Sequence, residues 1–207
     1  MKRILLLECS PHGQHARGNR LALQVIEQRW PAAELIERDL ATQPLPPLSG
    51  DYATALTGSA SFDDPAFACS ETLIGELERS DCLIIATPMH NFTVPAALKL
   101  WIDYVLRIHR TFAATPQGKV GLLEDRPTLV LVSAGGFYQG ERARQPDFLT
   151  AYLRHVLGTL GITQVEFIHL QGMAHGADAA NAALQGALAQ LERTAYFPLS
   201  LSTEIAS

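Results

Sequence analysis

Three short segments carry residue types that bind small molecules: 10–19, 88–92 and 133–137. In the first, Ser10 contributes a hydroxyl group and Arg17 a positive charge, beside backbone amides that we expect at a helix N-terminus. Such a helix end attracts anions because its first N–H groups have no acceptor within the helix. The segment lacks the GxxxxGK[ST] and GxGxxG patterns of nucleotide-binding loops. A plain strand-to-helix turn is the alternative reading of this segment alone.

The second and third segments suit a flat ligand. Asn91 offers hydrogen-bond donors and an acceptor, and Met89, His90 and Phe92 offer apolar or stacking surface. The glycine pair at 135–136 allows backbone amides to approach a ligand closely. Together with an anion site, these segments fit a phosphorylated planar cofactor such as flavin mononucleotide (FMN).

Continuous apolar runs alternate along the chain with segments of helical periodicity. The runs predict strands at 3–7, 34–40, 81–86, 128–132 and 164–170, and the periodic segments predict helices at 20–30, 65–79, 98–108, 149–160 and 180–191. Strands so uniformly apolar are typical of a parallel sheet that helices bury on both faces. The alternation therefore predicts a doubly wound α/β fold. In such sheets ligands bind beyond the carboxyl ends of the strands, where the three segments begin.

Composition limits the classes of protein and partner. The 207 residues predict one domain, 1–207, and no apolar run approaches the roughly 18 residues of a membrane span. The net charge of −5, without a basic patch, argues against nucleic acid as a partner. The three cysteines form no CxxC pair, which favours a reducing cytoplasm, and we expect Cys9 and Cys82 to be buried thiols. His12 and His15 have no convincing third ligand, so we expect them to lie in a solvated loop and not to form a metal site.

One segment, 42–64, interrupts the alternation. It contains three prolines and two glycines and shows no sustained periodicity, and it is long for a connection within a domain. We expect it to be an ordered excursion over the surface, with an oligomer interface as one use for it.

The segment 88–103, with the sequence PMHNFTVPAALKLWID, resembles the signature of FMN-dependent NADH-azoreductases, which are flavodoxin-like reductases of quinones and azo compounds. The resemblance continues through 107–112, 133–136, 148–163 and 166–176. It implies a flavodoxin-like three-layer sandwich, in which helices cover both faces of a five-stranded parallel sheet. It also implies a homodimer with an active site at each subunit boundary.

The resemblance implies a cofactor and its contacts. FMN would be tightly bound, one per subunit, with NADH or NADPH as co-substrate and ping-pong hydride transfer to quinones or azo compounds. The flavin would carry the chemistry, so no catalytic side chain is required. By position, the implied FMN contacts are Ser10, Ala16, Arg17, Gly18, Met89, His90, Asn91, Phe92, Ser133, Ala134, Gly135 and Gly136.

The chain also departs from the family pattern. Ala16 and Gly18 stand where the family usually has hydroxyl residues, which removes two hydrogen bonds worth about 1 kcal/mol each and predicts weaker FMN binding. His90 replaces a usual Tyr, Ala134 a frequent Arg, and His109 a frequent Gly. His90 is therefore a candidate proton donor to substrate. An unchanged pH dependence of turnover in His90→Phe would contradict that role.

Two further points stay open from the sequence. Phe112 and Phe137 are candidates for an apolar wall against which substrate stacks, with core packing as the alternative for each. A flavodoxin-type electron carrier and a flavin-free regulatory or binding module are the alternatives to the enzyme. The modest net charge favours the enzyme over the carrier, whereas Ala16 and Gly18 suggest the flavin-free module.

Overall fold

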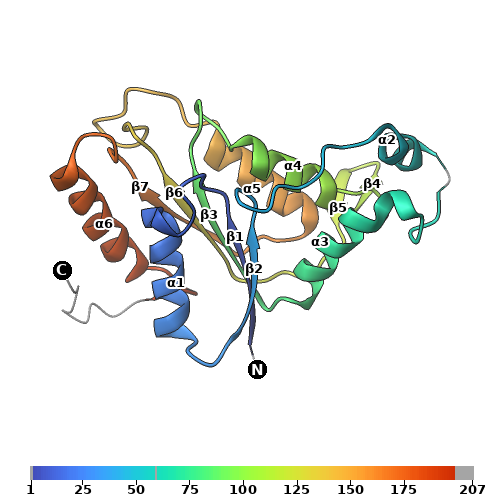
Figure 1. The fold of residues 1–207 in the computed structure, drawn as a ribbon, viewed down its shortest axis with the longest axis horizontal. Helices are drawn as coiled ribbons and strands as arrows, with labels where there is room; N and C mark the ends of the chain where they lie inside the picture. The colour runs from blue at the N-terminus through green and yellow to red at the C-terminus, as the bar shows by residue number, and fades with distance from the viewer. Residues whose placement is uncertain (1, 59, 199–207) are drawn as a thin grey trace.

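The computed structural model describes residues 2–58 and 60–198. Its main sheet has five parallel strands in the order β2-β1-β3-β6-β7, which confirms the predicted fold class (Figure 1). The strands are β1 Arg3–Glu8, β2 Glu34–Asp39, β3 Cys82–Pro88, β6 Thr128–Ser133 and β7 Val165–Leu170. The middle strands β1, β3 and β6 are almost wholly buried, as their uniformly apolar sequences require.

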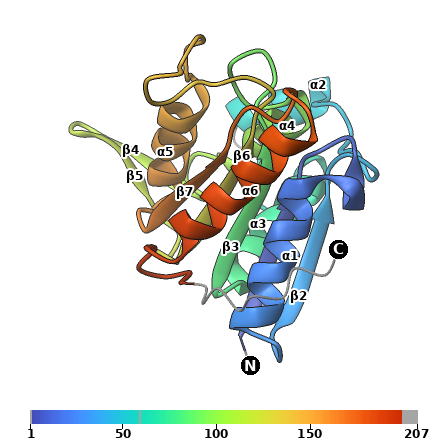
Figure 2. The same ribbon diagram turned by 90° about the vertical axis from the view of Figure 1, so that its left-hand side faces the viewer.

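Helices cover both faces of this sheet (Figures 1 and 2). On one face lie α1 Arg17–Arg29 and α6 Ala177–Leu191, and on the other lie α3 Ala68–Arg79, α4 Ala96–Val105 and α5 Leu149–Leu160. Alternate residues of β1 enter the two apolar cores: Leu6 packs with the α1 side, and Leu5 and Leu7 pack with the α3 side. These three layers form the predicted sandwich.

The strand order reverses beside β1, and this reversal places the binding segments together. The chain leaves β1 for β2 on one side and then returns to place β3 on the other side. The registers align Glu8 with Ala86 and Pro88 with Ser133, so β1, β3 and β6 end at the same edge. The loops that follow these strands must therefore meet at one place.

Several predicted boundaries need correction. The predicted helix 98–108 is wrong at its end, because α4 stops at Val105 and Ile108 instead forms a bridge with Phe112. The segment predicted as one helix from Pro65 begins as a short 3₁₀ turn, Pro65–Phe67, before α3. The predicted helix 149–160 is confirmed as α5, and Gly161 ends it in the left-handed conformation at φ 103°.

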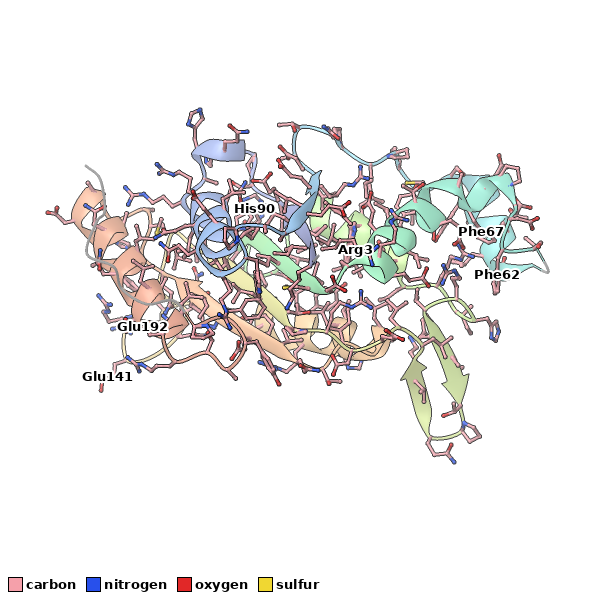
Figure 3. All side chains as sticks on the ribbon, turned by 90° about the horizontal axis from the view of Figure 1, so that it is seen from below. Arg3, Phe62, Phe67, His90, Glu141 and Glu192 are labelled. Atoms are coloured by element: carbon pink, nitrogen blue, oxygen red, sulfur yellow. The ribbon has the colours of Figure 1, made fainter. Side chains whose placement is uncertain are left out.

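The segment 42–64 contains a helix that periodicity did not predict, α2 Gly50–Thr57. The Ser49 hydroxyl accepts a hydrogen bond from the Tyr52 amide and caps this helix. The Tyr52 ring is buried, with its centroid 5.7 Å from that of Phe67 and 5.2 Å from that of Tyr104. Tertiary packing of one aromatic side chain thus fixes an eight-residue helix. Phe62, near the end of segment 42–64, lies away from His90 (Figure 3), and the use of this segment in an oligomer interface stays a prediction.

A second addition is an antiparallel hairpin of β4 Phe112–Thr115 and β5 Gly118–Gly121, which projects from the rest of the molecule (Figure 3). The apolar runs did not predict this hairpin, because each strand has only four residues. Gly118, at φ 123°, is the turn signal that would have indicated it. The base of the hairpin lies against the end of α5, where the backbones of Gly121 and Gly161 come into close contact.

This contact predicts that Gly121→Ala destabilises the fold. A Cβ atom at residue 121 would overlap the backbone of Gly161, and backbone cannot move aside as a flexible side chain can. We expect a loss of about 3 kcal/mol in the free energy of unfolding, measured by urea denaturation. Gly158→Ala is the matched control, because this exposed glycine of α5 has open space at its Cβ position. That change should stabilise by about 0.5–1 kcal/mol. Equal stabilities for the two variants would contradict the packing argument.

Candidate functional site

A cavity of about 340 Å³ lies at the carboxyl ends of β1, β3 and β6. Nine of the twelve predicted cofactor contacts line it, and Asn91, Phe92 and Gly136 do not. The nine are Ser10, Ala16, Arg17, Gly18, Met89, His90, Ser133, Ala134 and Gly135. Segments separated by more than one hundred residues are therefore brought together as the strand order requires.

The first wall of the cavity is the turn after β1 and the start of α1. The turn forms a short 3₁₀ segment, Gly13–His15, which is fixed by hydrogen bonds from the Gly13 amide to the Ser10 carbonyl and from the Asn19 side chain to the Gly13 carbonyl. Ala16 is the N-cap of α1 and has no side-chain oxygen to accept from the first-turn amides. These amides therefore lack a capping partner, and this end of the cavity favours an anion.

The first turn of α1 approaches the end of β6 very closely. A Cβ atom at Gly18 would lie 2.9 Å from the Ser133 hydroxyl oxygen. The glycine thus leaves the space beside the helix end to a hydroxyl group that β6 supplies. The two residues come from predicted contact segments that are far apart in sequence, and the structure makes them neighbours.

Arg17 has a partner that the sequence did not indicate. Its guanidinium Nη1 donates a 2.8 Å hydrogen bond to the side-chain oxygen of Asn181 in α6. Arg17 also lines the cavity, so α6 holds this positive group at the rim of the anion-binding end. No local pattern links residue 17 with residue 181, because the contact depends on how α6 packs beside α1.

The second wall is the glycine-rich segment after β6. The loop after β7 is bound to it by three hydrogen bonds, which run from the amides of residues 172, 173 and 174 to the carbonyls of residues 136, 134 and 135. These bonds use the carbonyl groups of the glycine segment. Among the described residues, the amides of Gly135 and Gly136 have no acceptor, so they remain available to a ligand. Met173, which the sequence analysis did not select, lines the cavity beside them.

The third wall follows β3, where residues 90–93 make a tight turn. The amides of His90 and Thr93 each donate to the carbonyl of the other residue, at 2.9 and 3.1 Å. Asn91 and Phe92 between them have φ values of 47° and 76°. Asn tolerates this left-handed conformation, whereas for Phe it costs about 1 kcal/mol. The turn points Asn91 and Phe92 to the surface, while Met89 and His90 line the cavity.

The ionisable residues of the cavity lining are all basic. Within the part of the chain that the structure describes, they are Arg17 and the three histidines His12, His15 and His90, and no Asp or Glu lines the cavity. His12 and His15 are exposed, as expected for a solvated loop, and they also line the cavity. Over residues 2–58 and 60–198, no group of three His, Cys, Asp or Glu side chains is arranged to hold a metal ion.

Comparison with known proteins gives the family. Residues 2–195 match the family model described as "Flavodoxin-like fold". An "FMN-dependent NADH:quinone oxidoreductase 4" of Pseudomonas fluorescens is 62% identical over 200 residues, which cover 95% of this chain and 97% of the relative. An "FMN-dependent NADH:quinone oxidoreductase 5" of Burkholderia lata is 56% identical over 92% of this chain and 94% of its own. The chain belongs to the flavodoxin-like family of FMN-dependent NADH:quinone oxidoreductases. The predicted family membership is confirmed.

Solved structures of low sequence identity share the fold. An azoreductase of Bacillus anthracis superposes with a TM-score of 0.77 at 23% identity, over 92% of this chain and 99% of that one. A second protein of that species, an FMN-dependent NADH-azoreductase in complex with FMN, has a TM-score of 0.73 at 19% identity, over 90% of this chain and all of the other.

In this member of the family, the two phenylalanines chosen as a substrate wall lie outside the cavity lining. Phe112 is buried at the base of the β4–β5 hairpin. Phe137 is half-buried and lies against Gly172, where a Cβ atom would come within 2.5 Å of the ring. It also packs beside His175, with ring centroids 5.4 Å apart. Both rings pack against the protein itself, and their use as a substrate wall stays a prediction.

One buried carboxyl group lies beneath the anion-binding end. Glu8, the last residue of β1, is only 2% exposed, and its Oε1 has no hydrogen-bond partner among the described residues. Burial raises the pKa of Glu8 to about 7, and the nearby carboxyl groups of Glu37 and Asp39 add to the rise, while the Asn19 side chain opposes it. Glu8 is therefore mostly neutral below about pH 7 and mostly ionised above it.

The raised pKa predicts how Glu8→Gln changes stability with pH. The folded protein keeps the Glu8 proton up to about pH 7, whereas the unfolded chain releases it near 4.5. As the pH rises from 4.5 to about 7, Glu8 ionises in the unfolded chain before it ionises in the folded protein, so the free energy of unfolding of wild type falls over this range. We expect the amide variant to melt roughly 10 °C above wild type at pH 8, with the difference disappearing near pH 4. Glu27→Gln, at an exposed position of α1, is the control and should follow wild type at both pH values. A constant difference for Glu8→Gln would contradict the assignment.

Proposed function

We propose that this protein is an FMN-dependent oxidoreductase that transfers electrons from NADH to quinones, with azo compounds as further acceptors. The observation that carries the proposal is a cavity with a basic, amide-lined end and an apolar end, formed by segments at the carboxyl edge of a flavodoxin-like sheet. The 62% identical relative bears the name of this activity. The resemblance of segment 88–103 to azoreductases supports azo compounds as further electron acceptors.

The cavity fits the phosphate of FMN at its basic end. The uncapped amides of α1, the Ser10 hydroxyl and the Arg17 guanidinium are groups that bind a phosphate monoester. The hydroxyl of Ser133 lies in the space beside Gly18 and is a further donor at this end. These groups would hold the phosphate without side-chain hydroxyls at residues 16 and 18.

The opposite end fits the flavin ring. Pro88 and Met89 give apolar surface to the cavity, and the unpartnered amide of Gly135, which lines it, is a donor for polar atoms at the ring edge. When bound, FMN supplies the two-electron transfer between nicotinamide and quinone. The chain positions the ring, binds its polar edge and shields one side from water. We keep His90, exposed at the cavity rim, as the candidate proton donor to substrate.

The remaining cofactor contacts stay proposals. Asn91 and Phe92 lie next to the cavity on the strained turn, and Gly136 lies next to Gly135. A small shift of either loop on ligand binding would bring these residues into contact. The unpartnered amides favour a flavin enzyme over the flavin-free module. If the protein were instead an electron carrier, a quinone would not reoxidise its reduced FMN in a saturable reaction.

We further infer a homodimer, located in the cytoplasm. Phe92 is 44% exposed and Phe148 is 61% exposed, and the Phe148 amide donates a 3.1 Å hydrogen bond to the Phe92 carbonyl. An apolar pair of this kind beside a binding cavity suits cover by a second copy of the chain. A location in the reducing cytoplasm is supported by three free thiols, those of Cys9, Cys69 and Cys82. No helix among the described residues is both long and apolar enough to span a membrane.

A spectroscopic and kinetic assay tests the activity. The purified protein, titrated with FMN, should bind one flavin per chain, bleach on addition of NADH and regain its colour with benzoquinone. Initial rates at varied NADH and quinone should give parallel double-reciprocal lines, because donor and acceptor use the same space in turn. Comparison of NADH with NADPH identifies the preferred donor. A protein that stays colourless after titration with FMN would contradict the proposal.

Two arginine variants make the assay specific for the cavity. Arg17→Gln should weaken FMN binding by about tenfold, because a charged donor is lost at the phosphate end. Arg20→Gln removes a charge from the same helix outside this cavity lining, and it should change FMN affinity by less than about twofold. Equal losses in the two variants would indicate a general charge effect instead of a phosphate contact.

Light scattering coupled to gel filtration tests the dimer. We expect a mass of twice the 22.5 kDa chain. Phe148→Lys should shift the protein toward monomer, because a charge in the centre of an apolar interface must be desolvated. Leu35→Lys on the exposed edge strand β2 is the matched control and should leave the mass unchanged. A wild type that elutes as a monomer would disprove the dimer.

A further inference from the structure

The ionisable side chains that line the cavity differ in type from those of the chain as a whole. The protein has 21 acidic and 16 basic side chains, so acidic residues prevail. Of the residues that the structure describes, the cavity lining nevertheless contains one arginine, three histidines and no carboxylate. Two of these histidines, His12 and His15, come from the turn at the anion-binding end, whereas His90 comes from the opposite wall. The turn therefore carries two nitrogen-bearing rings to the place where a negative charge is favoured.

The turn that carries His12 and His15 is well fixed. The His15 amide donates to the His12 carbonyl at 3.1 Å, and the Ala16 amide donates to the Gly13 carbonyl at 3.0 Å. The His12 amide lies 3.3 Å from the Ser10 hydroxyl oxygen, to which it donates. The backbone hydrogen bonds are thus satisfied locally, while neither imidazole ring has a hydrogen-bond partner among residues 2–58 and 60–198. Both rings keep an N–H donor available in either protonation state.

Residues 16–18, which follow the turn, supply few side-chain hydrogen-bond donors to a phosphate. Ala16 and Gly18 bring no polar side chain to this end, and Ser133 fills the space beside Gly18. Arg17 shares its guanidinium with Asn181. A phosphate monoester has three exposed oxygens, and each accepts more than one hydrogen bond. The amides of α1, the shared arginine and the hydroxyls of Ser10 and Ser133 supply donors from the protein side, so oxygen lone pairs that face solvent still accept hydrogen bonds from the side where the turn lies.

We propose that His12 and His15 are phosphate-binding residues, which donate to the 5′-phosphate of FMN from the solvent side of the cavity. This inference rests on the proposed function, since it takes FMN as the ligand. It assigns a role to two side chains that the sequence alone places in a solvated loop. It also makes the two histidines determinants of specificity for FMN over riboflavin, which has the same ring and ribityl chain without the phosphate.

The test compares the affinities of FMN and riboflavin by flavin fluorescence on the full-length apoprotein. We expect His12→Ala and His15→Ala each to weaken FMN binding by about tenfold and the double variant by about a hundredfold. Riboflavin binding should change by less than about twofold, because no contact with the ring is removed. His12→Lys with His15→Arg should restore the preference for FMN, because both side chains again present charged donors.

His155→Ala is the matched control, since His155 is exposed on α5 away from the cavity lining. Its two flavin affinities should equal those of wild type, and thermal melting should confirm that every variant folds. A double variant that keeps the wild-type ratio of affinities overturns the inference, and so does one that loses both flavins equally. Wild type that fails to bind FMN would instead overturn the proposed function.

Discussion

The alignment of three parallel strand ends is the constraint on which the site depends. Because β1, β3 and β6 run in the same direction and in fixed register, their following loops must start at one edge of the sheet. The reversal of strand order beside β1 separates the helices on the two faces and opens a space between these loops. The cavity is therefore a result of sheet topology, and the loop residues determine only what it binds.

Electrostatics then divides the cavity into two ends. The uncapped first turn of α1 and the arginine held by α6 give one end a positive character, and the two histidines of the turn add side-chain N–H donors there. Directly behind this end lies Glu8, whose burial favours its neutral form below about pH 7. An ionised carboxylate there would oppose an anionic ligand, so the same burial that costs stability at high pH protects the binding end. The other end is apolar, with free backbone amides at its border.

Much of this arrangement could be predicted from local patterns. Apolar runs gave the five strands of the main sheet, because strands buried on both faces cannot contain many polar residues. Two elements were missed for a common reason. Helix α2 depends on the packing of Tyr52 between Phe67 and Tyr104, and the β4–β5 hairpin depends on the contact of Gly121 with Gly161. Short elements that are stabilised by distant residues leave little periodicity in the chain.

The sequence by itself determined the fold class, the family and the three segments that surround the cavity, since these follow from strand composition and from one specific run of residues after the third predicted strand. The tertiary structure decided which members of those segments face one another. The hydrogen bond of Arg17 to Asn181, the approach of Gly18 to Ser133 and the orientation of the turn at Gly13–His15 toward the cavity all depend on packing between elements. Such contacts join residues through space, and a linear pattern records only neighbours along the chain.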